Sequence, residues 1–182
     1  MNPRAEVNIL RAGEFYIYCL WIQGQMTDLI SFKVYPDLVE PYLDRPDRVP
    51  PALVSHRARY AQLDFTTVRK EFVALFEKDL VGRDLGDLEA IGYLRNVISH
   101  SQVSLAREYF LYRPVAGDEH ETRVMRDLGL GRIGDPLDPQ TLMLRFFDDE
   151  SYLSTFSRIN RLDKVCFQKI AAKLGVPHVR IR

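Results

Sequence analysis

The chain has 182 residues, a length typical of one domain, and its 46% hydrophobic and 27% charged residues can supply an ordinary globular core. Basic and acidic residues balance at 25 each, which excludes a uniformly basic, phosphate-coating protein but allows a local basic site. The longest apolar run, Phe15 to Ile22, is far below the roughly 20 residues of a membrane span, and the N-terminus lacks a signal peptide's charged leader. We therefore expect a cytoplasmic protein with no membrane partner.

The first predicted helix begins at Asn2, a suitable N-cap, with Pro3 at the first helical position, and runs to about Val34 before Pro36. Its stretch Phe15 to Ile22 is apolar or aromatic all round, which indicates burial on more than one side, by the chain's own fold or by a partner. Cys19 and Cys166 lie in apolar stretches without metal-ligand spacing. We expect both to be buried, reduced thiols.

Residues 36–62 contain half of the ten prolines and are predicted to be mainly an ordered loop, with a short helix opening at Pro51. A clear helix follows from about Asp64. Its core-facing residues repeat at helical spacing and are Phe65, Val68, Phe72, Leu75 and Phe76.

A third helix is expected to begin after Asp84, as N-cap, and to end at or before Arg113, because Pro114 disfavours helix at the residue before it. Its apolar stripe is Leu88, Ile91, Leu94, Ile98, Leu105, Tyr109 and Tyr112. Residues 114–147 are expected to be irregular, with Thr122–Met125 and Thr141–Phe147 pairing as short strands. A last helix starts at Asp148 or Asp149 and is closed by Gly175 and Pro177. The expected fold is mainly α: a single domain, 1–182, with inserts at about 36–62 and 113–147 and a short β hairpin near 122–147.

The stretch from Tyr93 to Ser101 contains the residues best suited to chemistry. On an ideal helix, Tyr93, Asn96, His100, Ser104 and Arg107 share one polar face, opposite the apolar stripe. We predict His100 and Asn96 as catalytic residues, together with Arg95, and Tyr93, Ser104 and Arg107 as substrate-binding residues. Arg95 lies about 140° around the helix from His100, so either the helix kinks near Asn96 or a two-fold dimer completes the site.

The pattern Arg95-Asn96-x-x-x-His100, on a late helix of a small helical domain, resembles the signature of the HEPN superfamily of ribonucleases and toxins. The resemblance implies an up-and-down helical bundle and a metal-independent endoribonuclease without a cofactor. It also implies a homodimer whose two motifs share one cleft. The substrate would be RNA, and the products would have 2′,3′-cyclic phosphate and 5′-OH ends. The implied role is in toxin–antitoxin or antiphage defence, in some systems with an antitoxin protein as partner.

These residue types suit such chemistry. A base that removes the 2′-OH proton allows that oxygen to attack the adjacent phosphate, and imidazole titrates near neutrality. Arginine binds phosphate bidentately and offsets the charge that develops on it, whereas asparagine orients the imidazole or donates to a phosphate oxygen.

Two alternatives stay open: a HEPN-like domain that binds RNA or nucleotide without cutting it, and a helical interaction module in which the motif is incidental. Other polar clusters favour structural explanations. The acidic run 148–150 is typical of helix capping, and residues 118–121 are typical of a solvated loop without metal-ligand spacing. His56, Arg57 and Arg59 fit either a solvated face or a basic loop that holds RNA phosphates.

Overall fold

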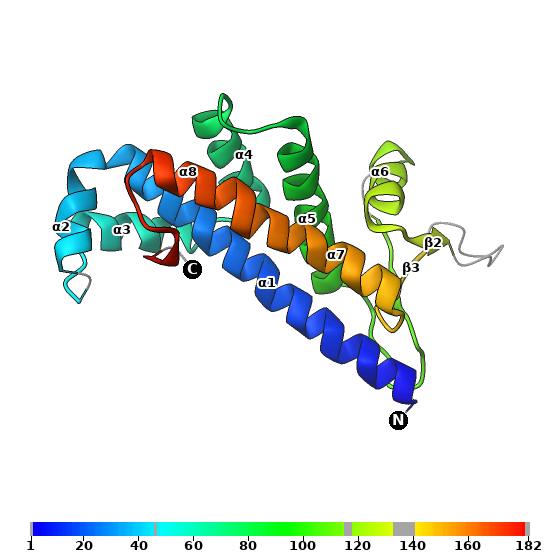
Figure 1. The fold of residues 1–182 in the computed structure, drawn as a ribbon. Coiled ribbons are helices and arrows are strands. Elements are labelled where there is room, and N and C mark those ends of the chain that lie inside the picture. The colour runs from blue at the N-terminus through cyan, green and yellow to red at the C-terminus, as the bar shows by residue number, and fades with distance from the viewer. Residues whose placement is uncertain (1, 46, 115–117, 133–140, 181–182) are drawn as a thin grey trace. The chain divides into compact units, whose positions relative to one another are not determined.

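The computed structural model describes residues 2–45, 47–114, 118–132 and 141–180. The fold is mainly helical with a small antiparallel sheet, as the sequence predicted (Figure 1). Contacts divide the chain into two compact units, Met1–Cys19 with Glu89–Ile159, and Leu20–Leu88 with Asn160–Arg182. None of the helices in the described ranges is long and apolar enough to cross a lipid bilayer.

Helix α1, Pro3–Val34, has the predicted bounds, and the Asn2 side chain accepts a hydrogen bond from the Arg4 backbone N–H at 3.0 Å. In the first unit α1 buries Ala5, Ala12, Phe15 and Cys19, whereas Leu10 and Ile17 are each 66% exposed. The chain's own fold therefore covers only part of the apolar run, and burial of the remaining side by a partner stays a prediction.

The sheet of the first unit has the order β1-β3-β2, with antiparallel pairing throughout. Its strands are β1 (Phe110–Tyr112), β2 (Gly131–Arg132) and β3 (Leu142–Leu144). A strand within the predicted stretch 141–147 is confirmed over Leu142–Leu144, and it forms an antiparallel pair with β2 instead of with the predicted partner at 122–125. Alternate residues of β1 and β3, Phe110, Tyr112, Leu142 and Leu144, face the core.

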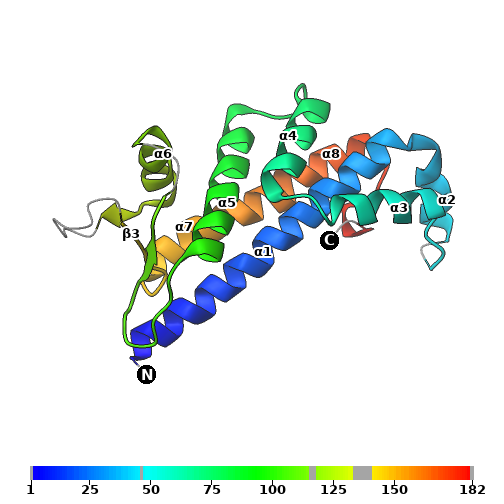
Figure 2. The same cartoon turned by 180° about the vertical axis from the view of Figure 1, so that it is seen from behind.

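The predicted strand at 122–125 is wrong, because these residues lie in helix α6, Asp118–Leu128. Glu121 and Val124, three residues apart, are both buried, which is helical periodicity, and Gly129 ends the helix with φ of +64°. Glu121 pairs at 2.7 Å with Arg132 of β2, which holds α6 beside the sheet (Figure 2).

Two polar residues of α1 fix the chain as it leaves β3. Asn8, fully buried, accepts from the Phe146 N–H, and Arg11 donates to the Phe146 carbonyl oxygen at 2.8 Å and pairs with Asp149 at 2.6 Å. Helix α7, Asp149–Arg161, then begins with Asp148 as N-cap, whose carboxylate accepts from the Ser151 N–H at 2.8 Å. This confirms the capping interpretation of the acidic run.

The second unit is more helical between 36 and 62 than the sequence predicted. A 3-10 turn, η1 (Pro36–Leu38), and helices α2 (Val39–Asp44) and α3 (Pro51–Tyr60) occupy much of the expected loop. The reason is that Pro36, Pro41 and Pro51 fall in first turns, where proline has no N–H bond to lose. The helix opening at Pro51 is confirmed.

Helix α4, Phe65–Phe76, begins where predicted, and Asp64 is its N-cap, accepting from the Thr67 N–H at 2.8 Å. Helix α5, Gly82–His100, begins earlier than expected. Asp84 is not its N-cap but lies in its first turn, accepting from the Val81 N–H at 3.0 Å and pairing with Arg161 at 2.7 Å.

After α7 the chain continues through a π-helical turn, η2 (Leu162–Phe167), into α8 (Gln168–Lys173) and a final turn, η3 (His178–Arg180). Gly175, with φ of +71°, closes α8 as predicted. Cys19 and Cys166 are buried free thiols, again as predicted, and burial raises the pKa of each to about 12.

Candidate functional site

The polar face of α5 holds Tyr93, Asn96 and His100, as predicted. Tyr93 and Asn96 are half-buried, and the Tyr93 hydroxyl donates to Glu89 one turn earlier at 2.8 Å. His100 is the last residue of α5 and is exposed. An exposed imidazole on a regular helix is accessible to a ligand while its backbone is held in place.

Ser104 and Arg107 do not extend this face, because α5 ends at His100. The hydroxyl of Ser99 donates to the Arg95 carbonyl at 2.8 Å and that of Ser101 to the Val97 carbonyl. Beyond them, Gln102 exchanges two backbone hydrogen bonds with Leu111, at 2.7 and 3.1 Å, which turns the chain toward β1. The expected helix to residue 112 is therefore wrong, and Ser104 and Arg107 lie in the loop between α5 and β1.

Arg95 is half-buried. Its Nη1 donates to Asn96 Oδ1 at 3.3 Å, and its Nε is buried and has no hydrogen-bond partner among the described residues. Its charge lies near enough to Cys19 of α1 to oppose the rise that burial causes in the pKa of that thiol. The structure thus joins Arg95 to Asn96 but does not bring Arg95 and His100 of one chain into the same pocket.

His100 instead lines a pocket of about 190 Å³ together with Gln102, Leu111, Arg113 and Thr141. The pairing of Tyr112 with Leu142 brings Arg113 and Thr141 opposite one another, one step further along the two strands. Thr141 is 5% exposed, and its hydroxyl has no hydrogen-bond partner in the described parts of the chain. A guanidinium, a buried hydroxyl and an imidazole therefore meet at the end of α5.

Sequence reasoning missed Arg113 and Thr141, because only the β1–β3 register brings them to His100. The signal available in the sequence was the alternation of apolar residues in 110–113 and 141–144, which is too short to distinguish strand from helix.

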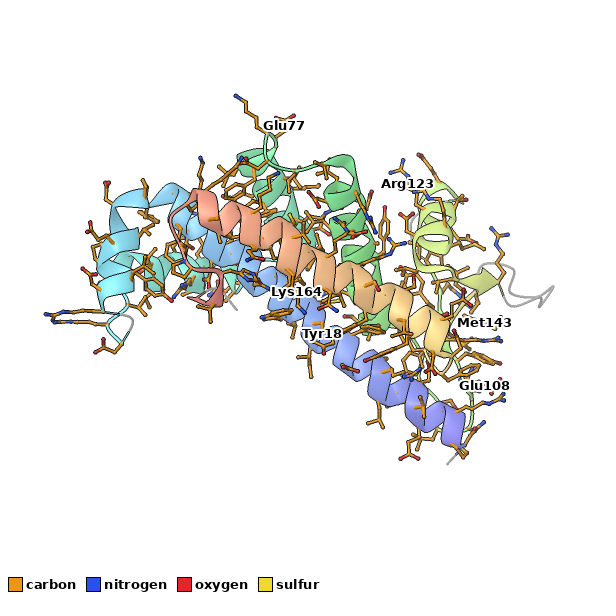
Figure 3. All side chains as sticks on the ribbon, viewed as in Figure 1. Tyr18, Glu77, Glu108, Arg123, Met143 and Lys164 are labelled. Atoms are coloured by element: carbon orange, nitrogen blue, oxygen red, sulfur yellow. The ribbon has the colours of Figure 1, made fainter. Side chains whose placement is uncertain are left out.

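A second group that the sequence missed lies on α6. Arg123, shown on that helix in Figure 3, interacts with Tyr93 and pairs with Glu119. Burial raises the pKa of the Tyr93 hydroxyl, and the hydrogen bond to Glu89 and the charge of that carboxylate raise it further. The Tyr93 end of the polar face is thus occupied by ion pairs, which leaves His100 as its accessible end.

Two further pockets contain none of the six predicted residues. One, of about 260 Å³ in the first unit, is lined by Arg126, Arg158 and hydroxyl side chains of α7. The other, of about 510 Å³ in the second unit, is lined by Trp21, Asp28 and Arg57 among others.

The basic residues of α3 do not form a loop. Arg57 pairs with Asp28 at 2.7 Å, and the His56 ring lies 2.9 Å from the Ser31 hydroxyl, so both are bonded within the second unit. The run 118–121, expected to be a loop, begins α6. In the described ranges, no three His, Cys, Asp or Glu side chains gather closely enough to hold a metal ion.

No protein-family model, curated protein or solved structure matches this chain. The HEPN resemblance therefore depends on the motif residues alone.

Proposed function

We propose that this chain is an endoribonuclease that cuts RNA without a metal ion, with His100 as its acid or base. The observation that carries the proposal is the placement of His100: an exposed imidazole at the end of a helix, on the polar face of Asn96, lining a pocket with other polar side chains. A phosphodiester can approach such an imidazole without rearrangement of the helix.

In this mechanism the neutral imidazole removes the proton of a ribose 2′-OH. The oxygen then attacks the adjacent phosphorus, and the 5′-oxygen of the next nucleotide leaves and takes up a proton from an acid. The products are a 2′,3′-cyclic phosphate and a 5′-OH end. Asn96 orients groups at the site, and Arg95 offsets the charge that develops on the phosphate.

The divergence of Arg95 and His100 supports the second part of the proposal, a two-fold dimer. Along α5 the two side chains are separated by five residues, which is about 140° of rotation and 7.5 Å of rise. In a symmetric dimer, Arg95 of one copy acts beside His100 of the other. The exposed Leu10 and Ile17 of α1, two turns apart on one side of the helix, supply apolar area for such an interface.

The first test is cleavage of a labelled RNA by the purified chain in excess EDTA. The expected result is EDTA-resistant cleavage that leaves cyclic phosphate ends and is blocked by a 2′-deoxy substitution at the cut site. A requirement for added Mg²⁺ or Mn²⁺ would show that the mechanism is wrong. As the biological role we propose a cytoplasmic toxin or antiphage nuclease, held in check by an antitoxin protein, so expression of the active chain should arrest growth.

A non-catalytic RNA-binding or protein-interaction domain is the second candidate. It is favoured by one observation, the contact of Arg95 with Asn96 and the burial of its Nε, which fits a structural arginine as well as a catalytic one. Binding of RNA without cleavage under every condition tested would select this candidate.

A further inference from the structure

We infer that His100, Arg113 and Thr141 form a binding site for one phosphate group of a polynucleotide. The inference deepens the proposed function, on which it rests for the identity of the polynucleotide as RNA. Neither Arg113 nor Thr141 belongs to the sequence motif, and the site lies within one chain.

The hydrogen-bonding groups of the pocket suit an anion. Arg113 carries a fixed positive charge with N–H groups that match two phosphate oxygens, and the Thr141 hydroxyl and the His100 imidazole can each donate one hydrogen bond. In the described part of the chain no carboxylate lines the pocket, so nothing there would repel an anion. The donor set that the described residues supply favours phosphate over a cation.

The Thr141 hydroxyl is the strongest indication that the pocket receives a ligand. A buried hydroxyl without a partner costs free energy, and native proteins satisfy most such groups. Thr141 is 5% exposed and lines the pocket, and its Oγ1 lacks a partner in the described residues. The Oγ1 is itself buried, so rotation about the Cα–Cβ bond of Thr141 would turn the hydroxyl toward the pocket, where a phosphate oxygen would accept its hydrogen bond.

The size of the pocket limits what it holds. Its 190 Å³ is enough for a phosphate group. Among the described residues that line it, no aromatic side chain other than the His100 imidazole is present, so a base has little to stack on there. We therefore expect this site to bind phosphates with little preference for base sequence.

The site also has a fixed geometry. Arg113 and Thr141 follow and precede the paired strands β1 and β3, and Gln102, bonded to Leu111, connects β1 to the end of α5. The three donor groups are thus linked through backbone hydrogen bonds, which limits the change in structure needed for binding.

The experiment uses the full chain and two probes. A short DNA oligonucleotide tests polynucleotide binding by fluorescence anisotropy, because it lacks the 2′-OH and cannot be cut by the proposed mechanism. Inorganic phosphate tests anion binding, observed through the imidazole resonances of His100 in ¹H–¹³C NMR spectra. For the wild-type chain, we expect the oligonucleotide to change the chemical shifts of the His100 imidazole. Phosphate alone should change them only weakly.

Arg113→Met should weaken oligonucleotide binding about tenfold or more, because a charge-assisted hydrogen bond is lost. It should also abolish the change that phosphate causes in the His100 chemical shifts. Arg145→Met is the matched control, because Arg145 is also an exposed arginine just beyond a strand of the same sheet and does not line the pocket. It should bind like the wild type. Thr141→Val removes only the hydroxyl and should weaken binding without lowering the melting temperature.

Wild-type binding and unchanged phosphate response in both Arg113→Met and Thr141→Val would overturn the inference. A change in the His100 chemical shifts with phosphate but not with the oligonucleotide would also overturn it, because the pocket would then bind a free anion and not a polynucleotide. Failure of RNA cleavage, in contrast, contradicts only the proposed function, since neither probe depends on catalysis.

Discussion

At the scale of single residues, His100 is the group on which the proposed chemistry depends. His100→Ala should lower the rate of RNA cleavage by about 10²- to 10⁴-fold, the usual contribution of a general acid or base. Because the side chain is exposed, the melting temperature should stay close to that of the wild type. Cleavage time courses and thermal denaturation measure the two effects.

The control for this substitution is Lys164→Ala, an exposed residue of the second unit, which should cleave RNA like the wild type. Two results would count against the assignment. Undiminished cleavage by His100→Ala would show that the imidazole is not catalytic, and a large loss of stability would show that its role is structural.

Substitution of Asn96 should lower the cleavage rate less than substitution of His100. Its amide accepts from Arg95 at 3.3 Å, so Asn96→Ala removes a contact that water can partly replace. We expect a smaller decrease in cleavage rate than for His100→Ala, measured in the same assay. A larger decrease would show that Asn96, rather than His100, is the central residue of the motif.

At the scale of secondary structure elements, Asp148 illustrates how one side chain starts a helix. Asp148→Ala should destabilise the protein by about 0.5–2 kcal/mol at neutral pH, because the Ser151 N–H loses its acceptor. The hydrogen bond from this N–H holds the pKa of the Asp148 carboxyl below its ordinary value. Its stabilising contribution is therefore complete above the unfolded-state pKa and is lost as pH falls through the lower folded-state pKa.

Urea denaturation of wild type and Asp148→Ala at a series of pH values tests this dependence. The difference in the free energy of unfolding should be constant near neutrality and should shrink in acid. Glu150→Gln, at an exposed carboxylate of the same first turn, controls for general charge effects. A difference that persists below the folded-state pKa would rule out the carboxylate cap as its source.

The predicted elements succeeded where local rules decide the structure. The bounds of α1 follow from Asn2, Pro3 and Pro36, and α7 starts at a capping aspartate, Asp148, that bonds as expected. Helix α4 begins near Asp64 as predicted, and that aspartate is also a cap. Such signals act within a few residues and can be found in the sequence without knowledge of the fold.

The predictions failed where residues distant in the sequence determine the secondary structure. Leu105, Tyr109 and Tyr112 continue the helical spacing of α5, yet β1 forms because β3, some 30 residues later, offers backbone partners. The same pairing explains the site. The sequence correctly predicted that Tyr93, Asn96 and His100 share one face. Because α5 ends at His100, Ser104 and Arg107 lie in the following loop, and Arg113 and Thr141 line the pocket instead. Local periodicity contains no information about which strands pair.

At the scale of the whole molecule, the proposed dimer provides the most informative test of the motif. Neither Arg95→Ala nor His100→Ala should cleave RNA efficiently alone. If the site is shared, mixing the two variants should restore activity, because a mixed dimer has one site with both groups intact. Cleavage assays before and after subunit exchange measure the recovery, and each variant exchanged with itself is the comparison. No recovery in dimers shown to exchange would contradict a shared site.

Assembly itself should depend on the exposed side of α1. Leu10→Glu with Ile17→Glu places charge on two side chains that the single chain leaves 66% exposed. We expect these changes to shift the sedimentation coefficient from dimer to monomer without loss of helical circular dichroism. Lys33→Glu, on an exposed part of the same helix, should leave the assembly unchanged.

The unpaired hydroxyl of Thr141 has a consequence for laboratory evolution. Valine matches threonine in shape and spares the protein an unsatisfied buried group, so a library screened only for heat resistance should enrich Thr141→Val. A library screened for nucleic acid binding should remove the same substitution. Opposite enrichment at this codon under the two selections would show that threonine at position 141 lowers thermal stability and improves nucleic acid binding.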